Sequence, residues 1–367
     1  MSDFLNNRQS PQTIRAAVVQ AGPVLFDTAK TMAKLETLVR EAASQGADLV
    51  VLPEAFVGGY PKGLDFGARL GIRSPEGRDD FHRYYESAID LPGPEAARLG
   101  EIARDNGVHL VVGVIERDGG TLYCSSLSYA PSGDLVSKHR KLMPTALERL
   151  VWGFGDGSTI GVAETAIGRI GSVICWENYM PLLRMAMYAQ GVELYCAPTV
   201  DDRDTWLPTM RTIAIEGRCF VISACQYFKR SDGPEDYCPI QGDDPDTVLI
   251  RGGSCIMDPL GTVLVEPDFT GETIKLADLD RSLITKGKYD LDVAGHYARP
   301  DVFSLSVDTR PKKAVVFNGP AQPEPGSSAK HKPHVSEREL IDRQPGQHPM
   351  ESTNNSEPAD AHKPSER

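Results

Sequence analysis

The sequence predicts an α/β fold in a single domain, in which two β-sheets pack face to face between layers of helices. Three observations favour this class. Strand-like apolar runs alternate with segments of helical periodicity, the number of strands is high, and no internal linker separates them. The 40% hydrophobic content of the 367 residues is sufficient for a sizeable core.

The first elements are a strand, a crossover helix and a second strand. Thr13–Gln20 has the pattern of a buried strand, Thr28–Ser44 carries apolar residues at helical spacing, and residues 47–54 form a second buried run that ends at Glu54. Strands joined in this way are expected to be neighbours in one sheet. Glu54 therefore follows a strand end, where open α/β sheets place their chemistry. The alternative is an exposed acid beside the glycine-rich loop that follows.

A second helix and a hairpin come next. Pro94–Asn106 begins on a proline and stops at Gly107, which predicts a helix, and residues 109–116 form a further strand. Two strand-like runs, 122–130 and 135–138, flank a Pro-Ser-Gly-Asp turn and indicate a hairpin.

The exit of this hairpin, residues 138–149, is dense in charge. A solvated basic edge is the ordinary interpretation of such a run. Lys141 and Glu148 nevertheless stand out, because a lysine and a carboxylate that enter an apolar pocket together would each need the other.

Cys175 directly follows an apolar run, residues 171–174. A few residues later, Pro181 precedes a segment of helical periodicity over 182–190. We expect a strand-to-helix elbow that holds the thiol clear of the sheet. Backbone amides of such a turn can face the sulfur, a setting that lowers a thiol pKa and keeps a nucleophile accessible. The alternative is a small, inert core residue.

The alternation then continues to the end of the predicted domain, which spans residues 1–317. A long acidic loop, 229–246, interrupts the pattern and is a candidate pocket rim or subunit contact. The remaining elements are expected as strands over 193–197, 219–224, 253–257, 262–265, 273–279 and 314–317, and helices over 206–216 and 281–289.

Residues 318–367 are rich in Pro, Ser, Glu, Lys and His and have hardly any aromatic or β-branched residues. Such a segment cannot bury enough apolar surface to offset ordering, so a disordered tail is expected. Four of the eight histidines lie in it at irregular spacing and without cysteines, which favours solvated histidines over a metal site.

Charge and cysteine content narrow the class of protein. The formal charge of −12 argues against nucleic acid or an anionic membrane surface as the main partner. Residues 1–13 are polar, unlike a signal peptide, and no long apolar stretch is present, so a soluble cytoplasmic protein is expected. The seven cysteines are odd in number and form no C-x-x-C pair, which favours free thiols over disulfides or a structural zinc site.

Taken together, the segments around Glu54, Lys141 and Cys175 resemble the nitrilase branch of the carbon-nitrogen hydrolase superfamily, most closely plant-type nitrilases and their bacterial relatives. The resemblance covers residues 14–317, and Trp176 and Glu177 after the cysteine match nitrilases, whereas amidase-like members tend to carry an aspartate two places on. It implies a four-layer α-β-β-α sandwich that forms dimers through its outer helices and often larger spiral homo-oligomers. The matching segments are LPEAFVGGYPKG, HRKLMPTALERLVWGFGDGS, GSVICWENYMPLLRMAMYAQGVELYCAPT and GHYARPDVFSL.

The resemblance also implies roles for the marked residues. Cys175 would be the nucleophile that attacks a nitrile carbon, and Glu54 the general base and acid. Lys141 would stabilise the tetrahedral intermediate, with Glu148 supporting it. This scheme needs no metal and no organic cofactor, and its products are a carboxylic acid and ammonia.

The substrate implied is a small organic nitrile, arylaliphatic or aliphatic. Alternatives are an aliphatic amidase of the same superfamily, a cyanoalanine-type nitrilase with nitrile hydratase side activity, and a catalytically silent assembly protein that keeps the fold. The candidate pocket walls, each of whose aromatic rings could equally belong to the core, are Tyr60, Trp176, Thr199 and Trp206.

Overall fold

The computed structural model describes residues 11–313 and 315 and contains two large β-sheets. The first has the strand order β17-β1-β2-β6-β7-β8, with β5 also paired to β6. The second has the order β16-β15-β12-β11-β10-β9. Each sheet has a parallel centre, β1-β2-β6 in the first and β10-β11-β12 in the second, flanked by antiparallel strands.

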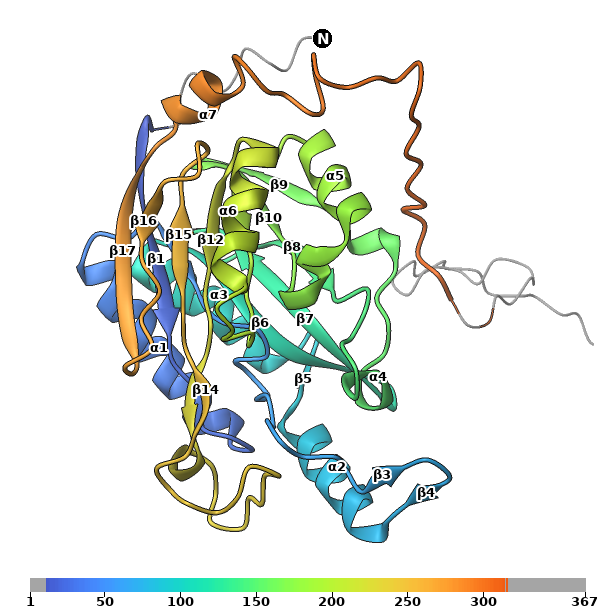
Figure 1. Cartoon of the computed structure of the whole chain (residues 1–367). Coiled ribbons are helices and arrows are strands. Elements are labelled where there is room, and N and C mark those ends of the chain that lie inside the picture. Colours follow the sequence, from blue (N-terminus) through green and yellow to red (C-terminus); the bar gives the residue numbers. More distant parts are fainter. Residues whose placement is uncertain (1–10, 314, 316–367) are drawn as a thin grey trace, which may run out of the picture. The chain divides into compact units, whose positions relative to one another are not determined.

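Alternating side chains along the strands build a four-layer sandwich. In β1 (Thr13–Gln20), Ala16 and Val18 face the second sheet, while Ala17 and Val19 face helices α1 (Thr28–Ser44) and α3 (Pro94–Asn106). The second sheet is covered on its outer side by α5 (Pro181–Ala189) and α6 (Trp206–Gly217). Successive side chains of a strand point to opposite faces, so each strand seals two layers. Figure 1 shows the helices on the two outer sides, and the predicted α-β-β-α architecture is confirmed.

Most predicted elements are found at or within a few residues of the expected positions. Of the first sheet these are β2 (Leu49–Val51), β6 (His109–Asp118), β7 (Thr121–Tyr129), β8 (Leu135–Arg140) and β17 (Thr273–Asp280), whereas the two-residue β5 (Ile89–Asp90) was not predicted. Of the second they are β10 (Gly168–Ser172), β11 (Leu194–Cys196), β12 (Phe220–Ser223), β15 (Cys255–Met257) and β16 (Val263–Val265), whereas β9 (Val162–Thr165) was not predicted. The helix expected over 281–289 is the shorter α7 (Ser282–Gly287).

Smaller elements extend from the sandwich. Helix α2 (Pro75–Ser87) is capped by Ser74, whose hydroxyl accepts the Gly77 N–H, and it follows a two-stranded ribbon of β3 (Ala68–Arg69) and β4 (Ile72–Arg73). The predicted long loop over 229–246 connects the two strands of a second ribbon, β13 (Tyr227–Lys229) and β14 (Val248–Arg251). The remaining short helices are α4 (Glu148–Val151), η2 (Gly157–Thr159), η3 (Cys175–Tyr179) and η4 (Arg230–Asp232).

The residues up to Lys313 belong to one compact unit, which holds every described helix and strand. The expected last strand falls, except for Val315, outside the described residues, and the expected tail over 318–367 lies outside them entirely. No helix among residues 11–313 has both the length and the apolar character needed to cross a membrane. All seven cysteines are described and free, and Cys238 is the exposed one.

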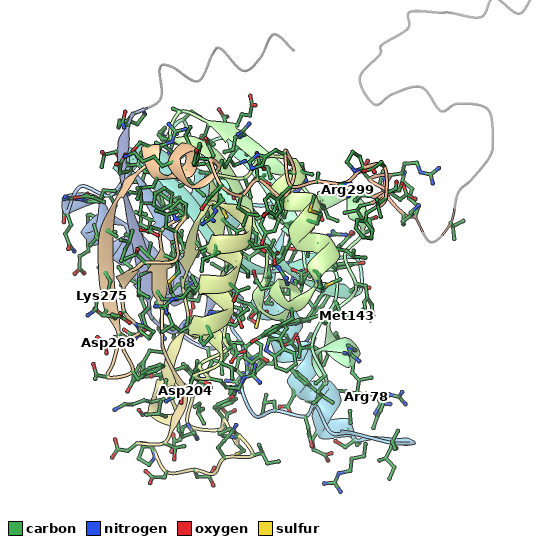
Figure 2. All side chains as sticks on the ribbon, turned by 45° about the horizontal axis from the view of Figure 1, so that its top comes forward. Arg78, Met143, Asp204, Asp268, Lys275 and Arg299 are labelled. Atoms are coloured by element: carbon green, nitrogen blue, oxygen red, sulfur yellow. The ribbon has the colours of Figure 1, made fainter. Side chains whose placement is uncertain are left out.

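Three strands end shortly before the three residues marked from the sequence. These are β2 and β8 of the first sheet, before Glu54 and Lys141, and β10 of the second sheet, before Cys175. Because β8 is antiparallel to β7, and β7 to β6, β8 runs in the same direction as β2. Glu54 after β2 and Lys141 after β8 therefore leave the sheet at the same edge. An ion pair outside this region is formed by Asp268 and Lys275, whose charged atoms lie 3.2 Å apart and which lie close together in Figure 2.

Candidate active site

Cys175 sits in a sharp turn between β10 and α5. Its backbone has a φ of +49°, a left-handed conformation that is uncommon for a residue with a Cβ. The Cys175 N–H is anchored to the Pro198 carbonyl at 2.9 Å, and Pro181 starts α5 soon afterwards. The predicted strand-to-helix elbow is therefore present, and its backbone at Cys175 is strained.

The sulfur contacts Thr199, which lies three residues after the neighbouring strand β11. The Thr199 hydroxyl lies 3.1 Å from the Cys175 sulfur and also accepts the Asp201 N–H at 2.9 Å. Since its oxygen is engaged by that backbone N–H, its hydrogen is free to point at the sulfur. Thr199 thus supplies a hydrogen bond that favours a thiolate.

Glu54 is brought to the sulfur by a tight turn that crosses β6. A Cβ at position 113 would lie 2.4 Å from the Pro53 carbonyl oxygen and 2.6 Å from the Glu54 Cα, so only glycine permits this close approach. Ala55 has a φ of +49°, a second left-handed residue beside a candidate catalytic group. The Gln226 side chain donates to the Glu54 carbonyl at 2.7 Å and anchors the turn from the other side.

Lys141 bridges two carboxylates in the interior. Its Nζ lies 2.6 Å from Glu54 Oε1 and 2.8 Å from Glu148 Oε2, and it stands 5.2 Å from the centre of the Trp152 ring. Glu148 is itself fixed by the Tyr60 hydroxyl at 2.8 Å and the Thr145 N–H at 2.6 Å. The lysine and Glu54 are fully buried, so the solvated basic edge considered for this segment is not formed at Lys141.

The pKa values of this cluster follow from burial and mutual charge. Burial alone would lower the pKa of Lys141, but Glu54, Cys175 and Glu148 outweigh it and raise that pKa well above the ordinary value. Burial raises the pKa of Glu54, while the adjacent lysine opposes the rise. The ammonium therefore stays charged, and the carboxyl is moved towards the range useful for proton transfer.

Cys175 departs from the expectation of a lowered thiol pKa. Burial, followed by the charge of Glu54, raises the pKa of the Cys175 thiol, and Lys141 only partly compensates. The sulfur is enclosed and lies near carboxylates. Both conditions raise the thiol pKa by more than the amides of the turn lower it. A thiol in such a place reacts only when a base takes its proton. Glu54 Oε2 is buried and has no hydrogen-bond partner among the described residues, so one lone pair is available for that proton.

A cavity of about 240 Å³ opens onto the sulfur. Trp176 forms part of its wall and is 40% exposed; its indole N–H donates to Asp201 at 2.8 Å, and Arg203 stacks 4.6 Å above its ring. The cavity is lined by Tyr60, Lys62, Thr145, Glu148, Cys175, Trp176, Val200, Asp201, Asp202 and Arg203.

Comparison with known proteins identifies the family. Residues 15–289 match the model of the carbon-nitrogen hydrolase family. The chain belongs to the carbon-nitrogen hydrolase family. It is 59% identical over 302 residues to an aliphatic nitrilase of Sinorhizobium fredii, and the match covers 82% of this chain and 98% of that protein. It is 54% identical over 311 residues to a bifunctional nitrilase/nitrile hydratase of Lupinus angustifolius, covering 83% of this chain and 89% of that protein.

Solved structures support the same fold for this carbon-nitrogen hydrolase. Nit3 of Saccharomyces cerevisiae, a member of branch 10 of the nitrilase superfamily, superposes with a TM-score of 0.60 at 22% identity. The match covers 79% of this chain and 98% of that structure.

The structure brings together Glu54, Lys141, Glu148 and Cys175, the four residues marked from the sequence of this carbon-nitrogen hydrolase. Of the four candidate pocket residues, Tyr60 and Trp176 line the cavity. Thr199 contacts the sulfur instead of the cavity. Trp206 is 2% exposed, packs in the core beneath α6 and donates its indole N–H to Ser223, so it lies apart from this cavity.

Other neighbours of the site had no signal in the sequence of this carbon-nitrogen hydrolase. The Cys124 thiol approaches Glu54 Oε1 at 3.5 Å, and Asp201 with Arg203 forms a charged wall of the cavity. Cys124 comes from the middle of β7, where only knowledge of the register could have placed it. Among residues 11–313, no three His, Cys, Asp or Glu side chains gather in a way that could hold a metal ion.

Proposed function

We propose that this protein is a nitrilase that hydrolyses a small organic nitrile to a carboxylic acid and ammonia. The observation that carries the proposal is the buried lysine held by two carboxylates beside a cysteine that opens onto a cavity. The names of the relatives support the choice of nitrile, since the Sinorhizobium fredii protein is an aliphatic nitrilase.

The first half of the reaction forms a bond between sulfur and the nitrile carbon. Glu54 takes the proton of the Cys175 thiol, the thiolate attacks the carbon, and the nitrogen receives that proton from Glu54. The product is a covalent thioimidate. Because the thiol pKa is raised, transfer to Glu54 has to accompany substrate binding and attack, which limits reaction of the resting sulfur with other electrophiles.

The second half consumes two waters. One water, deprotonated by Glu54, adds to the thioimidate carbon and gives a tetrahedral intermediate, whose charge the Lys141 ammonium stabilises. Expulsion of ammonia leaves a thioester, and the second water releases the acid and restores the thiol. If the tetrahedral intermediate expels the sulfur instead, the product is an amide, as the name of the Lupinus angustifolius relative indicates for that protein.

The cavity supports aliphatic or arylaliphatic nitriles as substrates. Tyr60, Trp176 and Val200 offer apolar contact area, and a volume of about 240 Å³ suits a small molecule. The bound nitrile carbon has to lie against the Cys175 sulfur with its nitrogen towards Lys141.

We further propose that the chain associates into a homodimer through the outer helices, and into larger spiral oligomers. Exposed apolar residues on this side support the proposal, including Leu182 of α5 and Ile215 of α6. An apolar groove of about 690 Å³ lies between α5 and residues 293–309, where Phe303 is exposed. The groove and the cavity at Cys175 have no lining residue in common, so the two surfaces are separate. The free thiols fit a reducing compartment such as the cytoplasm.

Ammonia release tests the function. The protein is incubated with 3-phenylpropionitrile and, separately, with the corresponding amide, and ammonia is measured from each. Release from the nitrile that disappears in Cys175→Ala and persists in Cys238→Ala is expected, because Cys238 is the exposed cysteine and does not line the cavity. Release from the amide alone would instead indicate an amidase.

A further inference from the structure

The carboxylate of Glu177 connects the two segments that carry the nucleophile and the lysine. Its Oε1 accepts the Leu142 N–H at 2.6 Å, and its Oε2 accepts the Ile174 N–H at 3.0 Å. Leu142 directly follows Lys141, and Ile174 directly precedes Cys175. One fully buried side chain thus holds the backbone next to each reacting group.

His139 is a further hydrogen-bond partner of the Glu177 carboxylate. Its Nδ1 lies 3.1 Å from the Thr159 carbonyl oxygen, and its Nε2 lies 3.1 Å from Glu177 Oε2. A carbonyl oxygen and a carboxylate both accept, so this arrangement satisfies both ring nitrogens when the ring is protonated. Burial disfavours this charge, but Glu177 and the Thr159 carbonyl outweigh it and raise the pKa of His139.

The other charged groups of the surroundings are engaged elsewhere. Lys138 and Arg140, the neighbours of His139 on β8, point to the opposite face of the strand and pair with Glu116. Tyr195 of β11 lies near Glu177, and burial raises the pKa of its hydroxyl, so it stays neutral. His139, when protonated, is the ion-pair partner of Glu177 among the described residues.

We propose that His139 and Glu177 form a positioning pair that fixes the distance and orientation between Lys141 and Cys175. The elbow has other anchors, such as Asn178, whose side-chain amide donates to the Val173 and Cys175 carbonyls. Those bonds stay within the elbow, whereas Glu177 links it to the Lys141 segment. The inference rests on the proposed function, because it assigns a role in that reaction. A displacement of about 1 Å between reacting groups can cost on the order of a hundredfold in rate.

Glu177→Gln is the test and Glu116→Gln is its matched control. Glu116 is also a buried carboxylate that binds β8, but it holds only side chains and no backbone next to a reacting residue. Two rates are measured on folded protein: the alkylation of Cys175 by iodoacetamide, followed by mass spectrometry of its peptide, and kcat and KM for 3-phenylpropionitrile. We expect Glu177→Gln to slow alkylation and to lower kcat by about 10- to 100-fold with KM little changed, and Glu116→Gln to keep both rates near wild type.

The outcomes separate the two proposals. If Glu177→Gln matches Glu116→Gln in alkylation rate and kcat, and differs only in melting temperature, Glu177 is a fold residue and the inference is wrong. A wild-type protein that is alkylated at Cys175 but releases no ammonia from nitriles contradicts the proposed function alone, and the alkylation rates still decide the positioning role. If Glu177→Gln does not fold, His139→Gln carries the test, and its alkylation rate is expected to fall in the same direction by a smaller factor.

Discussion

The Lys141 ammonium lies 2.6 Å from the Glu54 carboxylate, with both side chains inaccessible to solvent. Such a pair is costly to desolvate and is held here by a third partner, Glu148 at 2.8 Å. A buried ion pair of this kind is weak evidence for stability but strong evidence for a site in which charge is needed.

Lys141→Met is expected to destabilise the fold by about 3–5 kcal/mol, because two carboxylates lose their common cation in the interior. Urea denaturation followed by circular dichroism measures the change. The control is Lys275→Met, which removes one partner of the exposed ion pair with Asp268 and should cost about 0–1 kcal/mol. Equal effects of the two substitutions would contradict the assignment of Lys141 as the centre of a buried charge cluster.

The acid side of the pH profile should report Glu54. Burial raises the pKa of this carboxyl above its ordinary value of 4.5, and it must be deprotonated to accept the thiol proton. We therefore expect kcat/KM to fall as the pH decreases through an apparent pKa above 4.5, measured as initial ammonia release at saturating and limiting nitrile. An acid limb at or below 4.5 would show that another group is the base.

His139 should make stability depend on pH in the opposite direction from a salt-bridged carboxylate. Its pKa is raised in the folded protein, so its contribution is fully present below about pH 6.5 and is lost as the pH rises through the folded-state pKa. The melting-temperature difference between wild type and His139→Gln is expected to be largest in mildly acid buffer and to shrink at alkaline pH. A difference that is constant with pH would argue for a neutral ring.

Tyr60→Phe should lower kcat about tenfold while the fold persists, because Glu148 loses a charge-assisted hydrogen bond of 2.8 Å. Steady-state kinetics with circular dichroism provides the comparison. Tyr85→Phe is the matched control, since its hydroxyl bonds the Gly119 carbonyl in an exposed loop. Comparable losses of kcat in both variants would remove the proposed role of the Tyr60 hydroxyl.

The sequence was most informative where local rules decide the structure. Proline and glycine at the ends of Pro94–Asn106 and the apolar periodicity of Thr28–Ser44 predict helices with the bounds that the structure has. Cys175 at a strand exit was recognisable for the same reason. These features depend on residues close together along the chain.

Long-range geometry was beyond such rules. That the Cys175 thiol pKa is raised depends on enclosure by other layers, and that Trp206 belongs to the core depends on how α6 packs on its sheet. The link of Glu177 to Leu142 spans two segments whose distance no periodicity reveals. Sequence patterns and the family resemblance therefore marked candidate residues, and tertiary packing determines how those residues are held.

The left-handed backbone of Cys175 sets folding and chemistry against each other at a single position. A conformation with φ of +49° is easiest for glycine, which has no Cβ, yet the reaction requires a side chain with sulfur there. Selection for thermal stability alone would favour glycine at position 175, and that substitution would abolish activity. Directed evolution of a more heat-resistant variant should therefore accumulate its gains on the outer helices and loops, and leave this turn unchanged.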